Sequence, residues 1–185
     1  MRFRINGFHT SENRENVEYV KKNAPFISKE HGQWLAQGYY FWTDIIKWAQ
    51  EWAYEHKIIT EFEIDIPREK VLDLVGSLSD QEKFYDMFID YCVLTKDPEI
   101  KKATVSKFLT YIRGKYLLFL RSEPEKAEVI FPFWAIRAKD GKHAERVKFK
   151  DGKRECMFLG ERHQLCVYEP HKDGHVTFKR LVEVT

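Results

Sequence analysis

Residues Trp34–Trp42 read Trp-Leu-Ala-Gln-Gly-Tyr-Tyr-Phe-Trp, and this aromatic stretch is the most informative part of the chain. We interpret its second half as a strand. Successive side chains of a strand point to opposite faces, and therefore Tyr39 and Tyr40 face opposite ways. One of the two packs in the core, and the other can face a cleft.

Away from this stretch, the chain places helical patterns first and strand patterns later. That order favours an α+β fold over a doubly wound sheet. Ser11 can cap a helix that runs through about Asn23. Residues 58–66 alternate like a half-buried strand, which Pro67 ends.

Residues from about 75 to 128 are interpreted as a helical insertion in a single domain that spans residues 1–185. Ser79 opens a capping-box sequence, and Asp97-Pro98 starts a second helix that reaches Gly114. Residues 129–136 begin a β-rich part whose Asp-Gly pairs predict hairpin turns, among them one at Asp151-Gly152.

The composition sets broader bounds. Hydrophobic residues make up 43% of the 185 residues and aromatic residues 15%, which is enough to bury a core. No run of eighteen apolar residues occurs, so we expect a cytoplasmic protein without a membrane span. The cysteines, Cys92, Cys156 and Cys166, lack C-x-x-C spacing and are interpreted as buried thiols. The histidines lack the spacing of a metal site, so we expect no metal.

Residues Arg137–Arg154 contain eight Lys and Arg side chains. A basic surface of this kind attracts anionic partners such as RNA or DNA. The alternative is a solvated hairpin surface without a partner, because acidic residues alternate with the basic ones. Both interpretations remain open from the sequence.

Two further segments combine with the aromatic stretch. Residues Phe8–Ser11 read Phe-His-Thr-Ser, and residues Gln164–Pro170 read Gln-Leu-Cys-Val-Tyr-Glu-Pro. With Trp34–Trp42, they resemble in order and spacing the nicotinamide-site motifs of ADP-ribosyltransferases, in the His-Tyr-Glu branch that includes diphtheria toxin and poly(ADP-ribose) polymerases. Residues Glu61–Leu74 look like a strand and turn found in a bacterial group of this superfamily.

The resemblance implies a split β-sheet core with flanking helices, and NAD as co-substrate. His9 would grip the ribose, Thr10 and Ser11 would complete the NAD-binding strand motif that grips the ribose and the carboxamide, and Tyr40 would stack on nicotinamide. Trp34 would border this site, although a loop Trp packed on its own domain is the alternative. Thr10 departs from the glycine of the family. Alanine at His9 or Tyr40 is expected to abolish transfer and leave thermal stability nearly intact.

Gln164 stands where most relatives carry a catalytic Glu. His163 and Gln164 must point to opposite faces of their strand, and the resemblance selects Gln164 for the cleft. A Gln amide can hydrogen-bond ribose hydroxyls but cannot act as a general base. This departure favours mono-ADP-ribosylation over chain elongation. Glu161, Glu169 or Glu183 could supply the carboxylate if the register differs.

Two classes of function follow from the resemblance. The first is a mono-ADP-ribosyltransferase that modifies a macromolecule, with nucleic acid slightly favoured over protein because Lys148, Lys150, Lys153 and Arg154 precede the Gln164 strand. Small bacterial members often act as toxins in toxin–antitoxin or antiphage systems, which would add a cognate antitoxin as partner. The second is a catalytically weak NAD-binding or nucleic-acid-binding module of the same fold.

Overall fold

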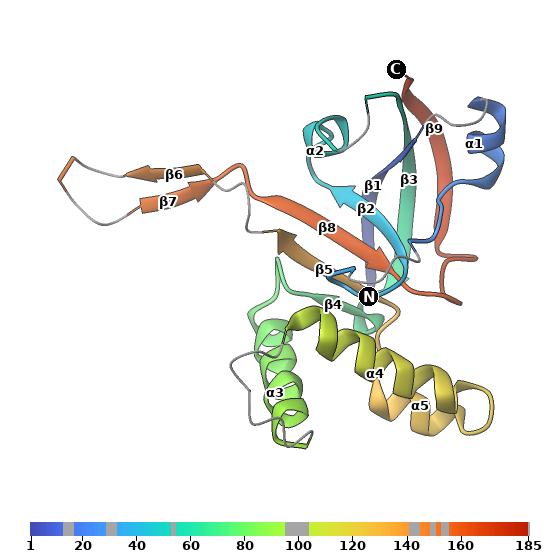
Figure 1. Ribbon diagram of the computed structural model, residues 1–185, viewed down its shortest axis with the longest axis vertical. Coiled ribbons are helices and arrows are strands. Elements are labelled where there is room, and N and C mark those ends of the chain that lie inside the picture. The colour runs from blue at the N-terminus through green and yellow to red at the C-terminus, as the bar shows by residue number, and fades with distance from the viewer. Residues whose placement is uncertain are drawn as a thin grey trace.

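The computed structural model describes residues 1–12, 17–28, 33–52, 55–94, 104–140, 145–148, 151–152 and 156–184. A seven-stranded sheet with the order β4-β5-β8-β2-β1-β3-β9 forms its centre (Figure 1). The strands of this sheet are β1 (Arg2–Glu12), β2 (Tyr39–Thr43), β3 (Lys57–Pro67), β4 (Val71–Asp73), β5 (Ala135–Asp140), β8 (Arg162–Val167) and β9 (Val176–Val184). Neighbouring strands are antiparallel except β4 and β5, which are parallel.

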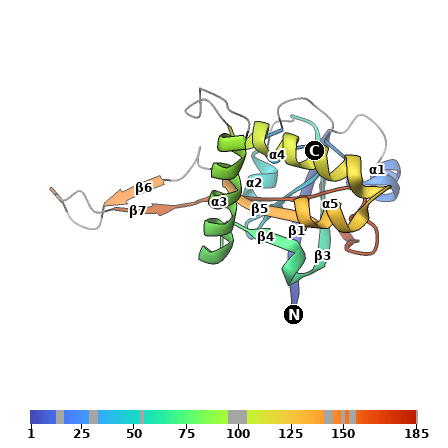
Figure 2. The ribbon, with the colours of Figure 1, turned by 90° about the horizontal axis from the view of Figure 1, so that it is seen from below.

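Five α-helices are described, and they are unevenly placed. They are α1 (Val17–Asn23), α2 (Lys47–Gln50), α3 (Leu78–Leu94), α4 (Val105–Leu120) and α5 (Pro124–Ile130), with one 3-10 turn at Arg68–Lys70. Helices α3, α4 and α5 lie together beside the β4-β5 edge of the sheet (Figures 1 and 2). Helices packed on a mainly antiparallel sheet agree with the expected α+β class. None of the described helices is long and apolar enough to span a membrane.

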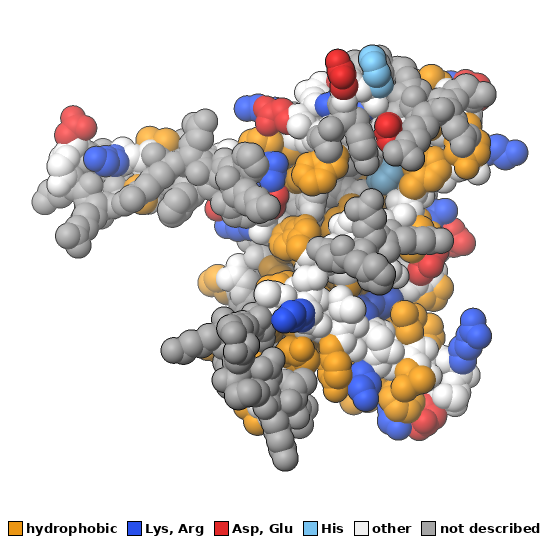
Figure 3. All heavy atoms as spheres, viewed as in Figure 1, with side chains coloured by type: hydrophobic (Ala, Val, Ile, Leu, Met, Phe, Trp, Pro, Cys, Tyr) orange, Lys and Arg blue, Asp and Glu red, His pale blue; other side chains and the backbone are white. Residues whose placement is uncertain are grey.

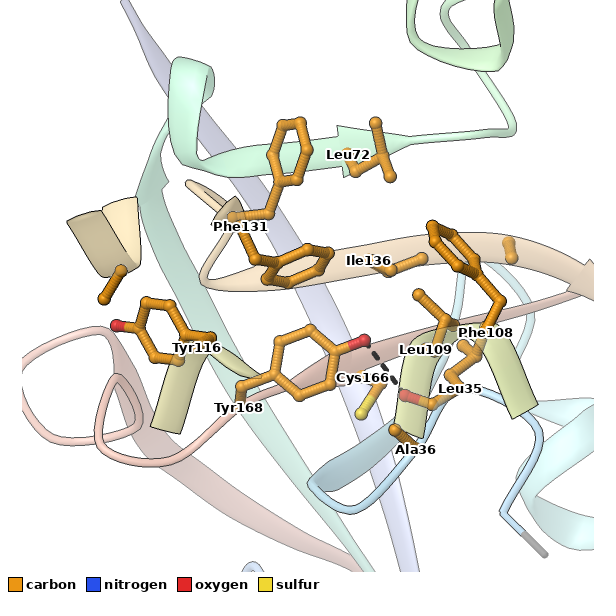
Figure 4. Close-up of a cluster of buried hydrophobic side chains, with 13 residues drawn as sticks. Leu35, Ala36, Leu72, Phe108, Leu109, Tyr116, Phe131, Ile136, Cys166 and Tyr168 are labelled. Carbon is orange, nitrogen blue, oxygen red and sulfur yellow. Dashed lines mark hydrogen bonds between the residues drawn. The ribbon is translucent and has the colours of Figure 1, made fainter. Parts of the chain in front are cut away.

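The largest buried cluster joins the helical group to the sheet (Figure 4). Phe108 and Leu109 of α4 pack with Leu72 of β4 and Ile136 of β5, and all four are at most 1% exposed. The opposite face of the sheet has its own cluster, in which Phe41 belongs to a buried group together with residues of β3 and β8. Burial of apolar area on both faces fixes the strand registers, because a slip of one residue would expose each set.

A second, two-stranded sheet pairs β6 (Glu145–Lys148) with β7 (Cys156–Leu159). It lies between β5 and β8 in the chain and projects away from the body of the molecule as an arm (Figures 1 and 2). The hairpin that the sequence predicts around Asp151-Gly152 is therefore confirmed. Gly152 has a φ of 72°, the left-handed conformation that such a turn requires of glycine.

Three expected boundaries were wrong. Ser11 does not cap a helix, because β1 continues to Glu12 and pairs with β3 along its whole length. The capping residue of α3 is Ser77 instead of Ser79, since the Ser77 Oγ accepts the Asp80 N–H at 3.2 Å. The segment from 129 to 136 is not one strand, because α5 extends to Ile130 and β5 starts only at Ala135.

Helix α4 also differs from expectation. It runs from Val105 to Leu120 and passes through Gly114, where the sequence predicts an end. Gly114 faces solvent, with nothing within 4 Å of where a Cβ would be. Glycine inside a helix costs about 1 kcal/mol relative to alanine, and the buried side chains of α4, Phe108 and Tyr116 among them, offset that cost. The predicted start at Asp97-Pro98 lies outside the described residues.

Candidate active site on neighbouring strands

The three motif segments lie on adjacent strands. Phe8 of β1 is opposite Trp42 of β2, and Trp42 is opposite Gln164 of β8. Residues separated by more than a hundred positions in the chain are thereby brought to neighbouring places in one sheet. The strand order β8-β2-β1 places the Gln164 strand directly beside the strand of Tyr40.

The pleat of the sheet divides the motif residues between two faces. Residues directly opposite in an antiparallel pair share a face, so Tyr40, Trp42 and Gln164 lie together, and we call this the Tyr40 face. His9 follows Phe8 and therefore points to the other side, where its ring lies 6.0 Å from that of Phe41. We call that side the His9 face. The structure thus brings Tyr40 and Gln164 together and directs His9 away from them.

The Tyr40 hydroxyl holds the loop that precedes β2. It donates to the Ala36 carbonyl at 2.6 Å and accepts the Leu35 N–H at 3.1 Å. Ala36 has a φ of 64°, a left-handed conformation that costs a non-glycine residue free energy and persists only where its surroundings fix it. The hydroxyl of Tyr168 binds the same loop by donating to the Leu35 carbonyl at 2.9 Å (Figure 4). A strained loop held at several points is typical of a functional site.

The surroundings of Gly38 explain why the aromatic stretch contains a glycine. A Cβ at this position would lie 2.5 Å from the Cys166 Sγ and 2.7 Å from the Val167 carbonyl oxygen. Only glycine allows the loop to approach β8 so closely. The approach also positions Trp34, whose Nε1 donates to the Gln164 Oε1 at 2.8 Å.

The Trp34–Gln164 hydrogen bond defines how Gln164 can act. An indole N–H can only donate, so the oxygen of the Gln164 amide must face Trp34. This oxygen keeps a second lone pair for a ligand hydroxyl, and the amide nitrogen can donate elsewhere. Gln164 is only 6% exposed, which limits access to it from solvent. The sequence motif predicts Trp34 at the border of the site, but it does not indicate this contact.

Two polar groups of the Tyr40 face, the Tyr40 hydroxyl and the Cys166 thiol, stay neutral. Burial is the largest cause that raises the pKa of the Tyr40 hydroxyl far above its usual value. Burial likewise raises the pKa of the Cys166 thiol, which lies on the same face. Tyr40 therefore acts as a hydrogen-bonding phenol and not as a phenolate at neutral pH.

His9 is enclosed by backbone partners. Its Nε2 accepts the Phe26 N–H at 3.2 Å, so the ring proton lies on Nδ1, which donates to the Tyr40 carbonyl at 3.0 Å. The side chain is 7% exposed, and burial lowers its pKa. A ligand could reach a ring nitrogen of His9 only by displacing one of these backbone groups.

The two residues after His9 are also bound to backbone. Thr10 shares the Tyr40 face, and its hydroxyl donates to the Ala49 carbonyl of α2 at 3.0 Å. The Ser11 hydroxyl donates to the Ile58 carbonyl of β3 at 3.4 Å. Both hydroxyls connect β1 to neighbouring elements, and both could still accept a hydrogen bond.

An ionic network that no sequence motif indicates lies on the His9 face. Asp44, with a φ of 70°, binds Arg137 at 2.5 Å and His163 at 2.9 Å. Burial alone would raise the pKa of Asp44, but hydrogen bonds from His163 and Arg137 outweigh it and lower the pKa. His163 thus belongs to this network, while its neighbour Gln164 faces the other side, as strand alternation requires.

The basic residues that are predicted to bind the acceptor have different surroundings. Arg137 and Lys139, at the base of the basic stretch, are paired with acidic side chains, Lys139 with Glu161 at 2.8 Å. Lys148 is exposed on β6. Lys150, Lys153 and Arg154 lie outside the described residues.

The alternative carboxylates have other partners. Glu161 binds Lys139 and His163, Glu169 accepts the Tyr39 hydroxyl at 2.8 Å, and Glu183 accepts the Gln50 amide at 2.8 Å. In the part of the chain that the structure describes, no group of three or more His, Cys, Asp or Glu side chains is arranged to hold a metal ion. The predicted burial of thiols is confirmed for Cys92 and Cys166, whereas Cys156 is half-buried.

Comparisons with protein-family models, with curated proteins and with solved structures find no match to this chain. The resemblance to ADP-ribosyltransferases therefore rests on the sequence motifs alone.

Proposed function

We propose that this protein binds NAD on the Tyr40 face and acts as a mono-ADP-ribosyltransferase toward a macromolecular acceptor. The observation that supports this best is the hydrogen bond between Trp34 and Gln164. Gln164 lies on β8, the strand next to the β2 strand that carries Tyr40. The Tyr40 face thereby carries an aromatic ring, a phenol and an oriented amide close together. These groups suit the flat, positively charged nicotinamide ring of NAD, which can stack on an aromatic face, and a ribose with hydroxyl donors.

In the proposed reaction, the bond between the ribose carbon and the nicotinamide nitrogen breaks, and an acceptor nucleophile forms the new bond to that carbon. The second lone pair of the Gln164 Oε1 would accept a ribose hydroxyl and orient the sugar. Gln164 cannot take the acceptor's proton, so the proton passes to solvent. The rate is therefore expected to be modest.

His9 has a positioning role in this proposal. Its Nδ1–H fixes the carbonyl of Tyr40, so it orients the strand residue that carries the phenol ring. Direct contact between His9 and the ribose, as the family motif implies, would require the Phe26 N–H to leave Nε2. A structure of the protein soaked with NAD would show which of the two arrangements holds.

The decisive experiment measures free nicotinamide released from NAD, with matched variants on the two faces of β8. Gln164→Leu should slow release by about tenfold or more, because the ribose loses its hydrogen-bond partner. Gln164→Glu keeps an acceptor for the Trp34 indole and adds the charge that favours a cationic ribose, so release should accelerate. His163→Gln, the adjacent residue on the His9 face, is the control and should keep turnover within about twofold.

Absence of nicotinamide release and of NAD binding would contradict the proposal. NAD that raises the melting temperature without being consumed would instead support the catalytically weak NAD-binding module. The uncharged Gln164 and the neutral Tyr40 are the features that favour this second candidate. Calorimetric titration with NAD and nicotinamide measurement on the same sample separate the two.

For the acceptor, we propose a nucleic acid held by the projecting β6–β7 hairpin. The basic side chains Arg137 and Lys139 at the base of the hairpin are paired with acidic side chains. The exposed positive charge of Lys148 lies farther out, on β6. Attraction of phosphates by such an arm falls steeply with salt. A toxin role with a cognate antitoxin stays a proposal that the resemblance alone supports.

The acceptor is tested by labelled transfer from NAD into RNA, single-stranded DNA and protein fractions. Joint replacement of Lys148, Lys150 and Lys153 by Glu should abolish nucleic-acid labelling and leave nicotinamide release unchanged. Lys107→Glu with Lys115→Glu, on the exposed surface of α4, is the matched control and should not alter labelling. Label that enters protein alone would refute a nucleic-acid acceptor.

A further inference from the structure

Helix α3 carries a row of hydrophobic side chains that faces solvent. Tyr85, Ile89 and Val93 are four residues apart, so they lie on one line along the helix, and they are 63%, 37% and 65% exposed. Leu78, at the start of the helix, is 82% exposed. Contiguous exposed hydrophobic side chains on a helix are unusual unless something covers them.

A row of acids runs beside this hydrophobic row. Glu82, Asp86 and Asp90 are also four residues apart and are all exposed. In helical projection, this row lies about 60° around the helix from the hydrophobic one. The exposed side of α3 therefore combines an apolar row with a parallel negative row.

The opposite side of α3 is already used by the fold. Phe84, Phe88 and Tyr91 pack around Phe108 of α4, with ring centroids 5.5, 5.6 and 5.4 Å apart. Figures 1 and 2 show α3 at the outer edge of the helical group, with α4 and α5 to one side of it. The exposed row is thus an additional surface that the core of this molecule does not need.

We propose that α3 is a docking surface for a partner protein that presents a basic amphipathic helix. Its apolar side chains would pack into the row of Tyr85, Ile89 and Val93, and its Lys or Arg side chains would face Glu82, Asp86 and Asp90. Rows spaced by four residues are the ridges that interdigitate when two helices pack. This surface is separate from the Tyr40 face, so the inference does not depend on NAD chemistry.

The negative row excludes other occupants. A nucleic acid or an anionic membrane would be repelled by three acids in line. A second copy of the chain, docked through the same helix, would place acids against acids. Charge complementarity therefore selects a basic helical partner.

The test uses two synthetic helical peptides that differ only in charge. Both carry Leu at positions i, i+4 and i+8, and one has Lys beside this row where the other has Glu. Fluorescence anisotropy should show that the Lys peptide binds the wild-type protein at least tenfold more tightly than the Glu peptide. Joint Glu82→Lys, Asp86→Lys and Asp90→Lys replacement should reverse that preference.

Two further variants separate docking from non-specific adhesion. Ile89→Ser with Val93→Ser should weaken the Lys peptide at least tenfold. Leu117→Ser with Leu118→Ser removes another exposed hydrophobic pair, 52% and 67% exposed on α4 (Figure 3 shows hydrophobic side chains over this helical group), and should not change binding. Equal affinity for both peptides, unchanged affinity in the α3 variants, or dimerisation of the protein in sedimentation would overturn the proposal.

Discussion

The two faces of the central strands differ in how their buried polar side chains are hydrogen-bonded. On the His9 face, His9 is enclosed by backbone groups and aromatic rings, and its nitrogens are both occupied. On the Tyr40 face, Tyr40 and Gln164 are bound through side-chain atoms to a loop, which leaves a lone pair of the Gln164 oxygen for a ligand. The first arrangement is that of a structural histidine, and the second is that of a site that can accept a ligand.

The difference shows that residues of one sequence motif do not have to lie in one site. His9, Tyr40 and Gln164 form one motif in the sequence, but strand pairing puts His9 on the reverse of the other two. The substitutions below therefore have effects on stability that the motif alone would not predict.

The largest effect is expected for His9→Ala. The change removes the side-chain partner of two partly buried backbone groups, the Tyr40 carbonyl and the Phe26 N–H, and each loss costs about 1–3 kcal/mol. The free energy of unfolding should fall by about 2–5 kcal/mol, contrary to the near-intact stability that the motif predicts. Urea denaturation measures it. His9→Asn, which can still donate to the Tyr40 carbonyl, should lose clearly less, and equal losses would contradict this account.

Tyr40→Phe should have the next largest effect. One hydroxyl serves both Leu35 and Ala36, so its removal should lower the free energy of unfolding by about 1–3 kcal/mol. Tyr39→Phe is the matched change on the neighbouring residue. It removes only a bond to the exposed Glu169 and should cost about 0.5–1 kcal/mol. A larger loss for Tyr39→Phe would mean that the Tyr40 hydroxyl does not hold the loop.

Two histidines with lowered pKa values, His9 and His171, should make stability depend on pH. The pKa of His9 is lowered by burial, and burial likewise lowers the pKa of His171 from 6.5 to about 4. The unfolded chain binds these protons more readily, so the stability from each neutral histidine is complete above pH 6.5 and is lost as pH falls toward its folded pKa. For each histidine, the free energy of unfolding changes by at most about 1.4 kcal/mol per pH unit, and by less for the partly exposed His171.

Denaturation in urea between pH 7 and 4 measures this dependence. Carboxylates act in the same direction, so the informative quantity is a difference between variants. His171→Gln removes one titrating group and keeps a partner for the Tyr116 hydroxyl. Adding His9→Asn to that background should flatten the slope further just below pH 6.5. Parallel curves for the two variants would show that His9 does not titrate with unfolding.

Much of the fold follows from local patterns in the sequence. The alternation of residues 58–66, the hairpin at Asp151-Gly152 and the opposite orientation of His163 and Gln164 depend on residues close in the chain. Such features are predictable because neighbours in sequence determine them.

The division of the motif between two faces was not predictable in this way. Within each strand the alternation is certain, but the relation between His9 and Tyr40 depends on the register of β1 against β2. Gly7 pairs with Thr43, and a shift by one residue would have put His9 and Tyr40 on the same face. The end of β1 at Glu12 is likewise set by its pairing with β3. Contacts of this range are fixed by tertiary packing.

The smallest effect is expected for Trp34→Phe, which keeps an aromatic ring and removes the indole N–H. The Gln164 oxygen, on a side chain that is 6% exposed, loses its donor, and the free energy of unfolding should fall by about 0.5–1.5 kcal/mol. Trp52→Phe, on a side chain that is 39% exposed, is the control and should stay within about 0.5 kcal/mol of wild type. A double-mutant cycle with Gln164→Leu isolates the bond, because two independent sites would give additive losses. Coupling near zero would mean that Trp34 only packs on its own domain, and the Tyr40 face would then lose the contact that orients its amide.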